Sequence, residues 1–206
     1  MESRPNTRAP RVTLVLALCM ALGATGFSLG LAGVLSWNEP FPEMGSLQFA
    51  ASPDEAEAWR RVEAIYREAH AAALRQHRPA INALAGVDLI SSGALLYGAI
   101  LAWMRSRKGL AALRTGLVLS QAYAFLAALV HTRVQLGVLD GLRPALAPLL
   151  QEGGPVAAAA RTMQEAQAGA VALAPAIPLL QLAFYWWAHR WSRRQAVREA
   201  LAPLAS

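Results

Sequence analysis

Two apolar runs joined by a short basic segment decide the fold. They are AINALAGVDLISSGALLYGAILAWM (80–104) and LAALRTGLVLSQAYAFLAALVHTRVQLG (110–137), with RSRKG (105–109) between them. Each run exceeds the roughly 20 apolar residues that a helix needs to cross about 30 Å of hydrocarbon. The joining segment suits a tight turn between antiparallel helices and carries three positive charges. The stretch therefore predicts a transmembrane hairpin whose turn lies in the cytoplasm.

The composition of the whole chain favours a membrane protein. Of its 206 residues, 55% are hydrophobic and only 16% are charged. Backbone groups in lipid must be satisfied within the protein, and the runs lack the alternation of a barrel, so the spans are expected to be helices. The net charge of +6 is not arranged as a basic patch with interleaved aromatic residues, so we expect no nucleic-acid partner. The single Cys19 excludes an intrachain disulfide.

Two further apolar runs flank the hairpin. Residues 12–36 carry no charge, and about 25 residues are more than the apolar region of a cleaved signal peptide contains, so they predict a first span. Residues 169–188 predict a fourth span. Pro175 and Pro178 remove backbone donors there and are expected to kink the helix. The predicted fold class is all-α, an integral membrane four-helix bundle.

Two polar segments connect these spans on the side opposite the basic turn. In the first, residues 37–79, the sequence Ser52-Pro53-Asp54-Glu55 supplies a helix cap, a proline at the first helical position and a capping box. It predicts an additional amphipathic helix over about 53–77, with a kink or break at Pro79. The apolar stripe of this helix could pack on the protein, lie on the membrane or receive a protein partner. The stripe consists of Trp59, Val62, Tyr66, Ala69 and Ala73. The second segment, residues 138–168, is expected to be a loop with a short helical piece up to Pro155, and helix is expected to resume from Val156 onward.

The distribution of charge predicts the orientation. If residues 1–11, 105–109 and 189–206 are cytoplasmic, the inner segments together with Arg114 hold 11 basic residues and two acidic ones. The outer segments then hold eight basic and ten acidic residues. The positive-inside rule therefore places both termini in the cytoplasm and both connecting segments outside, in a bacterial plasma (inner) membrane.

Asp88 is the only acidic residue within an apolar run, and a charge in hydrocarbon is costly and often functional. Sixteen uncharged residues separate it from Arg105. The same number separates Arg114 from His131 in the next run. This spacing places Asp88 and His131 at the same height and predicts an intramembrane polar pair, with Arg133 as the competing partner. The pair would either hold the helices in register or titrate and couple proton movement to a conformational change.

Small residues recur along one face of the first span. They are Gly23, Gly26, Gly30 and Gly33, at spacings of 3, 4 and 3. Without side chains, two helix backbones can approach closely. The face is expected to pack against a helix of the same chain or to form a homodimer.

No motif predicts catalysis, a metal site or a cofactor. His70 and His77 share a helix face but lie two turns apart, which does not make a zinc site without further ligands. No GxSxG, HExxH, P-loop or GxGxxG sequence occurs. We therefore expect a multi-pass membrane protein, not an enzyme, that acts by helix packing with partners as a subunit, assembly factor or scaffold. The alternative is a small oligomeric transporter or channel that uses Asp88 and His131.

Overall fold

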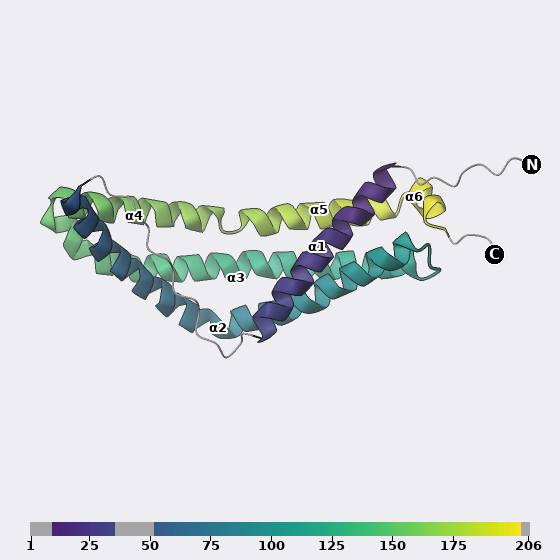
Figure 1. Cartoon of the computed structure of the whole chain (residues 1–206), viewed down its shortest axis with the longest axis horizontal. Helices are drawn as coiled ribbons and strands as arrows, with labels where there is room; N and C mark the ends of the chain where they lie inside the picture. The colour runs from purple at the N-terminus through teal and green to yellow at the C-terminus, as the bar shows by residue number, and fades with distance from the viewer. Residues whose placement is uncertain (1–9, 36–51, 203–206) are drawn as a thin grey trace, which may run out of the picture. The chain divides into compact units, whose positions relative to one another are not determined.

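The computed structural model describes residues 10–35 and 52–202. In these residues the regular elements are all helices, which confirms the all-α prediction (Figure 1). The helices are α1 (Pro10–Leu35), α2 (Pro53–Trp103), α3 (Gly109–Glu152), α4 (Gly154–Leu173), α5 (Ala176–Ser192) and α6 (Gln195–Ala200). Four segments are long and apolar enough to span a membrane. They are α1, α2, α3 and the stretch from Gly154 to Ser192 that contains α4 and α5. The predicted cytoplasmic tail 1–11, except its last two residues, and most of the first half of segment 37–79 lie outside the described residues.

The predicted amphipathic helix is not a separate element. It forms the first half of α2, which runs through Pro79 without a break. Its start follows the prediction, because the Ser52 hydroxyl accepts a hydrogen bond from the Glu55 amide at 3.2 Å. Of the predicted kink or break at Pro79, the break is wrong, and the kink stays a prediction. This residue is exposed, so the carbonyl that loses its partner can be solvated while the opposite face of the helix stays packed.

The first part of the second connecting segment, up to Glu152, is helical where a loop was predicted, whereas the helix predicted from Val156 onward is present in α4. α3 continues through Pro144 and Pro148, and the chain turns only at Gly153 and Gly154, whose φ values are +79° and +63°. Both prolines are exposed, four residues apart on one face. The buried face carries Leu142, Leu146 and Leu149. Burial of three leucines outweighs two missing hydrogen bonds on the solvated face.

The predicted proline kink in the fourth span corresponds to an interruption between two helices. α4 ends at Leu173 and α5 begins at Ala176, with Pro175 between them. A proline at this position cannot donate to the preceding turn, so one helix ends and the next begins.

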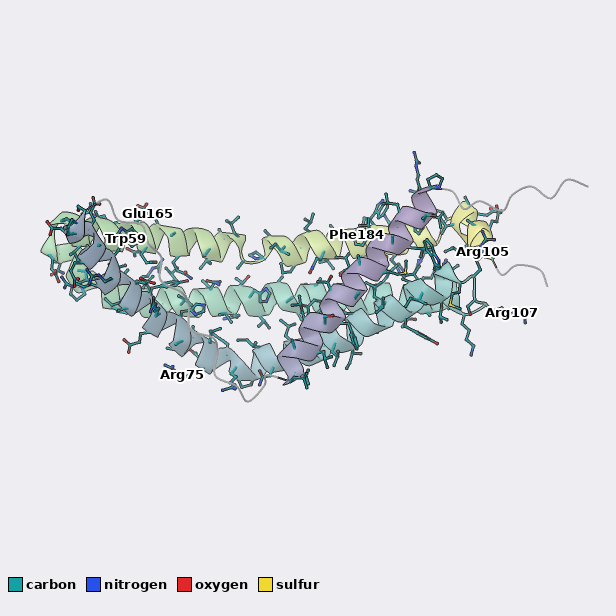
Figure 2. The ribbon with its side chains drawn as sticks, viewed as in Figure 1. Trp59, Arg75, Arg105, Arg107, Glu165 and Phe184 are labelled. Carbon is teal, nitrogen blue, oxygen red and sulfur yellow. The ribbon has the colours of Figure 1, made fainter. Side chains whose placement is uncertain are left out.

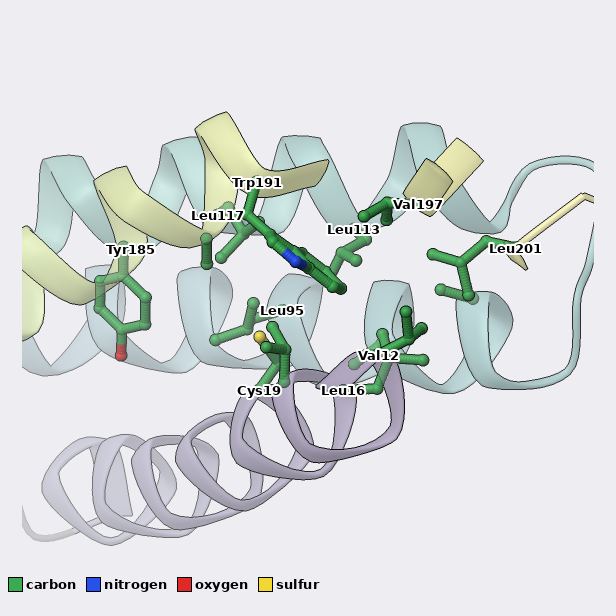
Figure 3. Close-up of a cluster of buried hydrophobic side chains, with 14 of the residues drawn as sticks. Val12, Leu16, Cys19, Leu95, Leu113, Leu117, Tyr185, Trp191, Val197 and Leu201 are labelled. Atoms are coloured by element: carbon green, nitrogen blue, oxygen red, sulfur yellow. The ribbon is translucent and has the colours of Figure 1, made fainter. Parts of the chain in front are cut away.

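The chain divides into two compact units. Unit 1 comprises, of the described residues, 10–35, 82–126 and 178–202. Its core contains side chains from α1, the second half of α2, the first half of α3, α5 and α6 (Figure 3). Leu16, Cys19, Leu95, Leu117 and Tyr185 are among its buried side chains. Large apolar side chains such as Leu29 and Ile90 are exposed on the outside of unit 1, as expected of a surface in lipid.

Unit 2 comprises, of the described residues, 52–81 and 127–177, and is a bundle of three helical segments with a core of its own. The core contains Ala58, Val62, Leu142, Leu146, Leu149, Ala159, Ala160 and Met163. The stripe predicted on residues 53–77 supplies Val62 to this core, and Trp59, Tyr66 and Ala69 pack at its edge. The stripe therefore packs against α3 and α4 of the same chain.

Polar contacts join the helices of unit 2. Arg61 of α2 donates two hydrogen bonds to the Glu152 carboxylate at the end of α3, at 2.9 and 3.0 Å. Gln167 of α4 is buried and donates to the backbone and side-chain oxygens of Gln135 in α3, at 3.0 and 2.8 Å. These contacts fix the register of α2 and α4 on α3.

Candidate functional site

The glycine face of α1 lies against the second half of α2 in unit 1. A Cβ at Gly23 would lie 2.8 Å from the Leu96 amide nitrogen, and one at Gly30 would lie 2.6 Å from the Leu89 amide nitrogen. A Cβ at Gly33 would lie 2.8 Å from the Ala85 Cβ. Real Cβ atoms do not approach neighbours so closely. The structure thus places the four glycines where two helix backbones within one chain meet.

Gly26 lies where the contact between α1 and α2 includes polar side chains. A Cβ there would collide with the Ser92 hydroxyl and lie 3.1 Å from Oδ1 of Asp88. The absence of a side chain at Gly26 lets α1 cover the carboxylate with its backbone. Asp88 is consequently buried, with only 8% of its surface exposed.

Two hydroxyl groups bind the buried carboxylate of Asp88. Ser92, one turn further along α2, donates a hydrogen bond of 2.8 Å to Oδ1. Tyr123 of α3 forms a side-chain hydrogen bond with Asp88, in which its hydroxyl donates to the carboxylate. Ser91, the residue preceding Ser92, donates a hydrogen bond of 3.2 Å to the backbone carbonyl of Asp88. We call Asp88, Ser92 and Tyr123, covered by Gly26, the Asp88 site.

A fourth helix reaches the neighbourhood of this site. Tyr185 of α5 is buried in the core of unit 1 (Figure 3), and the charge of Asp88 acts on it. Gln121 of α3 donates to the Tyr185 backbone carbonyl at 3.5 Å. The carboxyl group of Asp88 thus contacts groups of α1, α2 and α3, and its charge acts on Tyr185 of α5.

The structure does not test the predicted pair of Asp88 and His131. Asp88 belongs to unit 1, whereas His131 belongs to unit 2 and is exposed. The pair stays a prediction. Sequence reasoning did not assign Ser92 or Tyr123 to Asp88, although both positions carry a signal. Ser92 follows Asp88 by four residues, which is one helical turn.

Tyr123 could have been found by counting from the helix ends. Asp88 lies 15 residues before Trp103, the last residue of α2, and Tyr123 lies 14 residues after Gly109, the first residue of α3. Because α2 and α3 run antiparallel from a short turn, equal distances from the turn give equal heights. The prediction counted instead from Arg105 and Arg114, and Arg114 lies inside α3 rather than at its start.

The Asp88 site can perform two kinds of task. A buried carboxylate that accepts hydroxyl hydrogen bonds from two helices links those helices, because each donor would otherwise be unsatisfied. A buried carboxyl can also take up and release a proton when the surrounding helices move. The hydroxyl groups of Ser92 and Tyr123 bind the charged form of the carboxyl group.

Other candidate sites in the described residues are weaker. No three His, Cys, Asp or Glu side chains in this part of the chain come together as metal ligands. A hollow of about 280 Å³ lies in unit 2, lined by Glu55 and Trp59 of α2 and by Pro155 and Thr162 of α4, among others. Its volume is below that of a typical small-molecule site, which has about 300 to 1,000 Å³.

No protein-family model, curated protein or solved structure matches the chain. Its class follows from the helices alone. Four segments long and apolar enough to cross a bilayer, in an all-helical chain, are consistent with an integral membrane protein.

Proposed function

We propose that the chain is a multi-pass membrane protein that acts by helix packing with a protein partner, as a subunit, assembly factor or scaffold. One observation carries this proposal: α2 and α3 are longer than a bilayer is thick. With 51 and 44 residues, their lengths along the helix axis are roughly 77 and 66 Å at 1.5 Å per residue. The hydrocarbon core measures only about 30 Å, so each helix continues well beyond it.

The residues beyond the spans have the character of a water-exposed surface. Unit 2 carries exposed acidic and basic side chains in mixture, as at Arg60 and Glu57, which form an ion pair at 3.2 Å. Its apolar stripe is occupied by its own helices. Unit 2 is proposed to lie outside the cytoplasm, with both termini inside, and its charged outer surface or the lipid-facing side of unit 1 would meet the partner. The bacterial plasma membrane is the proposed location.

The orientation can be tested with single cysteines. Cys19 is the single cysteine of the sequence, so a Cys19→Ser background has no thiol other than the one introduced. In that background, Gln151→Cys beside the α3–α4 turn should react with a membrane-impermeant maleimide on intact cells. Lys108→Cys in the α2–α3 turn should react only after the membrane is permeabilised. Reaction of Lys108→Cys on intact cells would overturn the proposed orientation.

The partner can be tested by measuring the mass and composition of the complex after gentle extraction from its own membrane. A stoichiometric second protein would support the proposal. Photo-crosslinking residues at exposed positions of unit 2, such as Ala64 and Glu68, should then capture that same protein. The same residue at Leu29 or Ile90 of unit 1 provides the comparison for a contact within the membrane.

A second candidate function is favoured by the Asp88 site: a small oligomeric transporter or channel that uses a titrating carboxyl. A homo-oligomer with nothing else bound would support this candidate and count against the first. Proton or ion flux in vesicles would then be compared between the native chain and Asp88→Asn. Tyr123→Phe should lower the flux as well, whereas Tyr97→Phe, at a residue that is 62% exposed, should leave it unchanged.

A further inference from the structure

The α2–α3 turn and α6 lie at the same end of unit 1 (Figure 1), and both segments carry basic residues. Arg114 of α3 is fixed there by two hydrogen bonds. Its Nη2 donates to the Ser192 carbonyl oxygen at 2.6 Å, and its Nε donates to the Ser192 hydroxyl at 3.2 Å. Ser192 is the last residue of α5, so its carbonyl carries the negative end of that helix. The guanidinium of Arg114 is therefore held in one place.

Two further arginines lie beside Arg114. Val197 of α6 is buried in the same core cluster as Leu113 of α3 (Figure 3), which brings the adjacent Arg198 toward Arg114. Arg193 follows Ser192 directly in the turn after α5. The charges of Arg193 and Arg198 both act on Arg114, and both side chains are exposed.

His189 adds a polar atom without a partner. Its ring Nδ1 is buried and has no hydrogen-bond partner among the described residues. The positive charges of Arg193 and Arg114 act on this ring. A buried nitrogen without a partner is uncommon in folded proteins and calls for an explanation.

The described part of unit 1 offers these arginines little negative charge. It contains nine basic residues but only two acidic ones, Asp88 and Glu199. Asp88 is bound to Ser92 and Tyr123, and Glu199 accepts a hydrogen bond from Gln195 at 2.9 Å. The ion pairs Arg60–Glu57, Arg61–Glu152 and Arg67–Glu63 all lie in unit 2. Because the charges of Arg193 and Arg198 both act on Arg114, the three guanidinium groups repel one another, and a bound anion would relieve this repulsion.

We propose that Arg114, Arg193 and Arg198, together with His189, bind the phosphate group of an anionic phospholipid. Guanidinium groups match phosphate oxygens in pairs, which suits this anion better than a simple halide. Trp187 and Trp191 stack with ring centroids 6.4 Å apart in the adjoining part of α5. Tryptophans of this kind mark the level of lipid headgroups, and basic pockets between membrane helices bind such headgroups. Inorganic phosphate is the other source of the same chemistry.

The test uses the full chain purified in a neutral detergent and measures its thermal stability. Mixed micelles with dioleoyl phosphatidylglycerol should raise Tm relative to dioleoyl phosphatidylcholine. Arg193→Gln/Arg198→Gln should raise the phosphatidylglycerol concentration at half-effect by about tenfold or more, because each arginine near a headgroup contributes about 1 kcal/mol. Both side chains are exposed, so this variant is expected to fold. Arg114 is left in place because it also joins α3 to α5.

The control variant is Arg107→Gln/Lys108→Gln. It removes the same charge from the α2–α3 turn (Figure 2), and it should bind phosphatidylglycerol as the native chain does. If both variants bind phosphatidylglycerol equally weakly, the effect comes from general surface charge, and the proposed site is wrong. Absence of any preference for phosphatidylglycerol and of any effect of inorganic phosphate would overturn it as well. If inorganic phosphate alone raises Tm with the same difference between variants, the site holds and its ligand is free phosphate.

Discussion

Gly30 of α1 meets the backbone of Leu89 in α2 so closely that a Cβ on Gly30 would lie 2.6 Å from the Leu89 amide nitrogen. A backbone amide within a helix cannot rotate away as a side chain can. The contact therefore holds only while residue 30 is glycine. The same face includes Gly26, so the position of α1 and the burial of Asp88 depend on one another.

Gly30→Ala is expected to destabilise unit 1 by roughly 1 to 3 kcal/mol, the cost of overpacking a close contact. The control is Gly169→Ala in α4, where a Cβ meets nothing within 4 Å. That substitution should be neutral or stabilising by up to about 1 kcal/mol, because alanine favours the helix more than glycine does. The measurement is unfolding in mixed micelles followed by circular dichroism. Equal effects of the two substitutions would show that the α1–α2 contact is not close.

The Asp88 site yields a second prediction, about hydrogen bonds. Tyr123→Phe should lower the free energy of unfolding by roughly 1 to 3 kcal/mol, because a buried carboxylate loses a donor. Ser92→Ala should have a similar effect. In the double variant the losses should not add, since both hydroxyls bind the same group. Tyr97→Phe serves as the exposed control and should change little. Additive losses in the double variant would contradict a shared site.

The sequence predicted the helical hairpin at 80–137 because apolar runs longer than a bilayer leave few alternatives. It could not show that the hairpin helices continue as helices into polar sequence. Pro79, Pro144 and Pro148 each predict a break by local rules, and each lies on an exposed face of a continuous helix. Packing of the opposite face decided the outcome, and local rules do not contain that information.

The sequence predicted only those residues of the candidate site that are unusual in an apolar run. Asp88 stands out because its charge is unusual in an apolar run, and the glycines stand out by their spacing. Its hydroxyl partners do not stand out, because serine and tyrosine are ordinary residues in membrane helices. Their assignment needs the position at which α3 begins, and Gly109 rather than Arg114 gives that position.

The core of unit 2 yields a third prediction. Leu146 is fully buried between the helices, whereas Leu136 on the same helix is 36% exposed. Leu146→Ala should destabilise unit 2 by about 2 to 5 kcal/mol, and Leu136→Ala by much less. Hydrogen exchange should become faster in α4 and the first half of α2 for the first variant. If exchange stays slow there, unit 2 does not depend on this core.

The pH dependence of unit 2 can be predicted from His70. Burial lowers the pKa of His70 below its ordinary value of 6.5, so the unfolded chain binds a proton more readily than the folded one does. Its contribution is therefore fully present above pH 6.5, and stability is lost as the pH falls below that value through the folded pKa. His70 packs near Tyr66, with ring centroids 5.9 Å apart, so protonation would place a charge in a partly apolar contact.

The measurement is hydrogen exchange of α2 residues around His70 at pH 7.5 and pH 5.5, corrected for the intrinsic dependence of exchange on pH. Protection in the native chain should decrease at the lower pH. His70→Gln cannot gain a proton, so its protection should change less between the two values. A decrease of the same size in His70→Gln would assign the pH dependence to another group, because glutamine retains the polarity of the site without the titration.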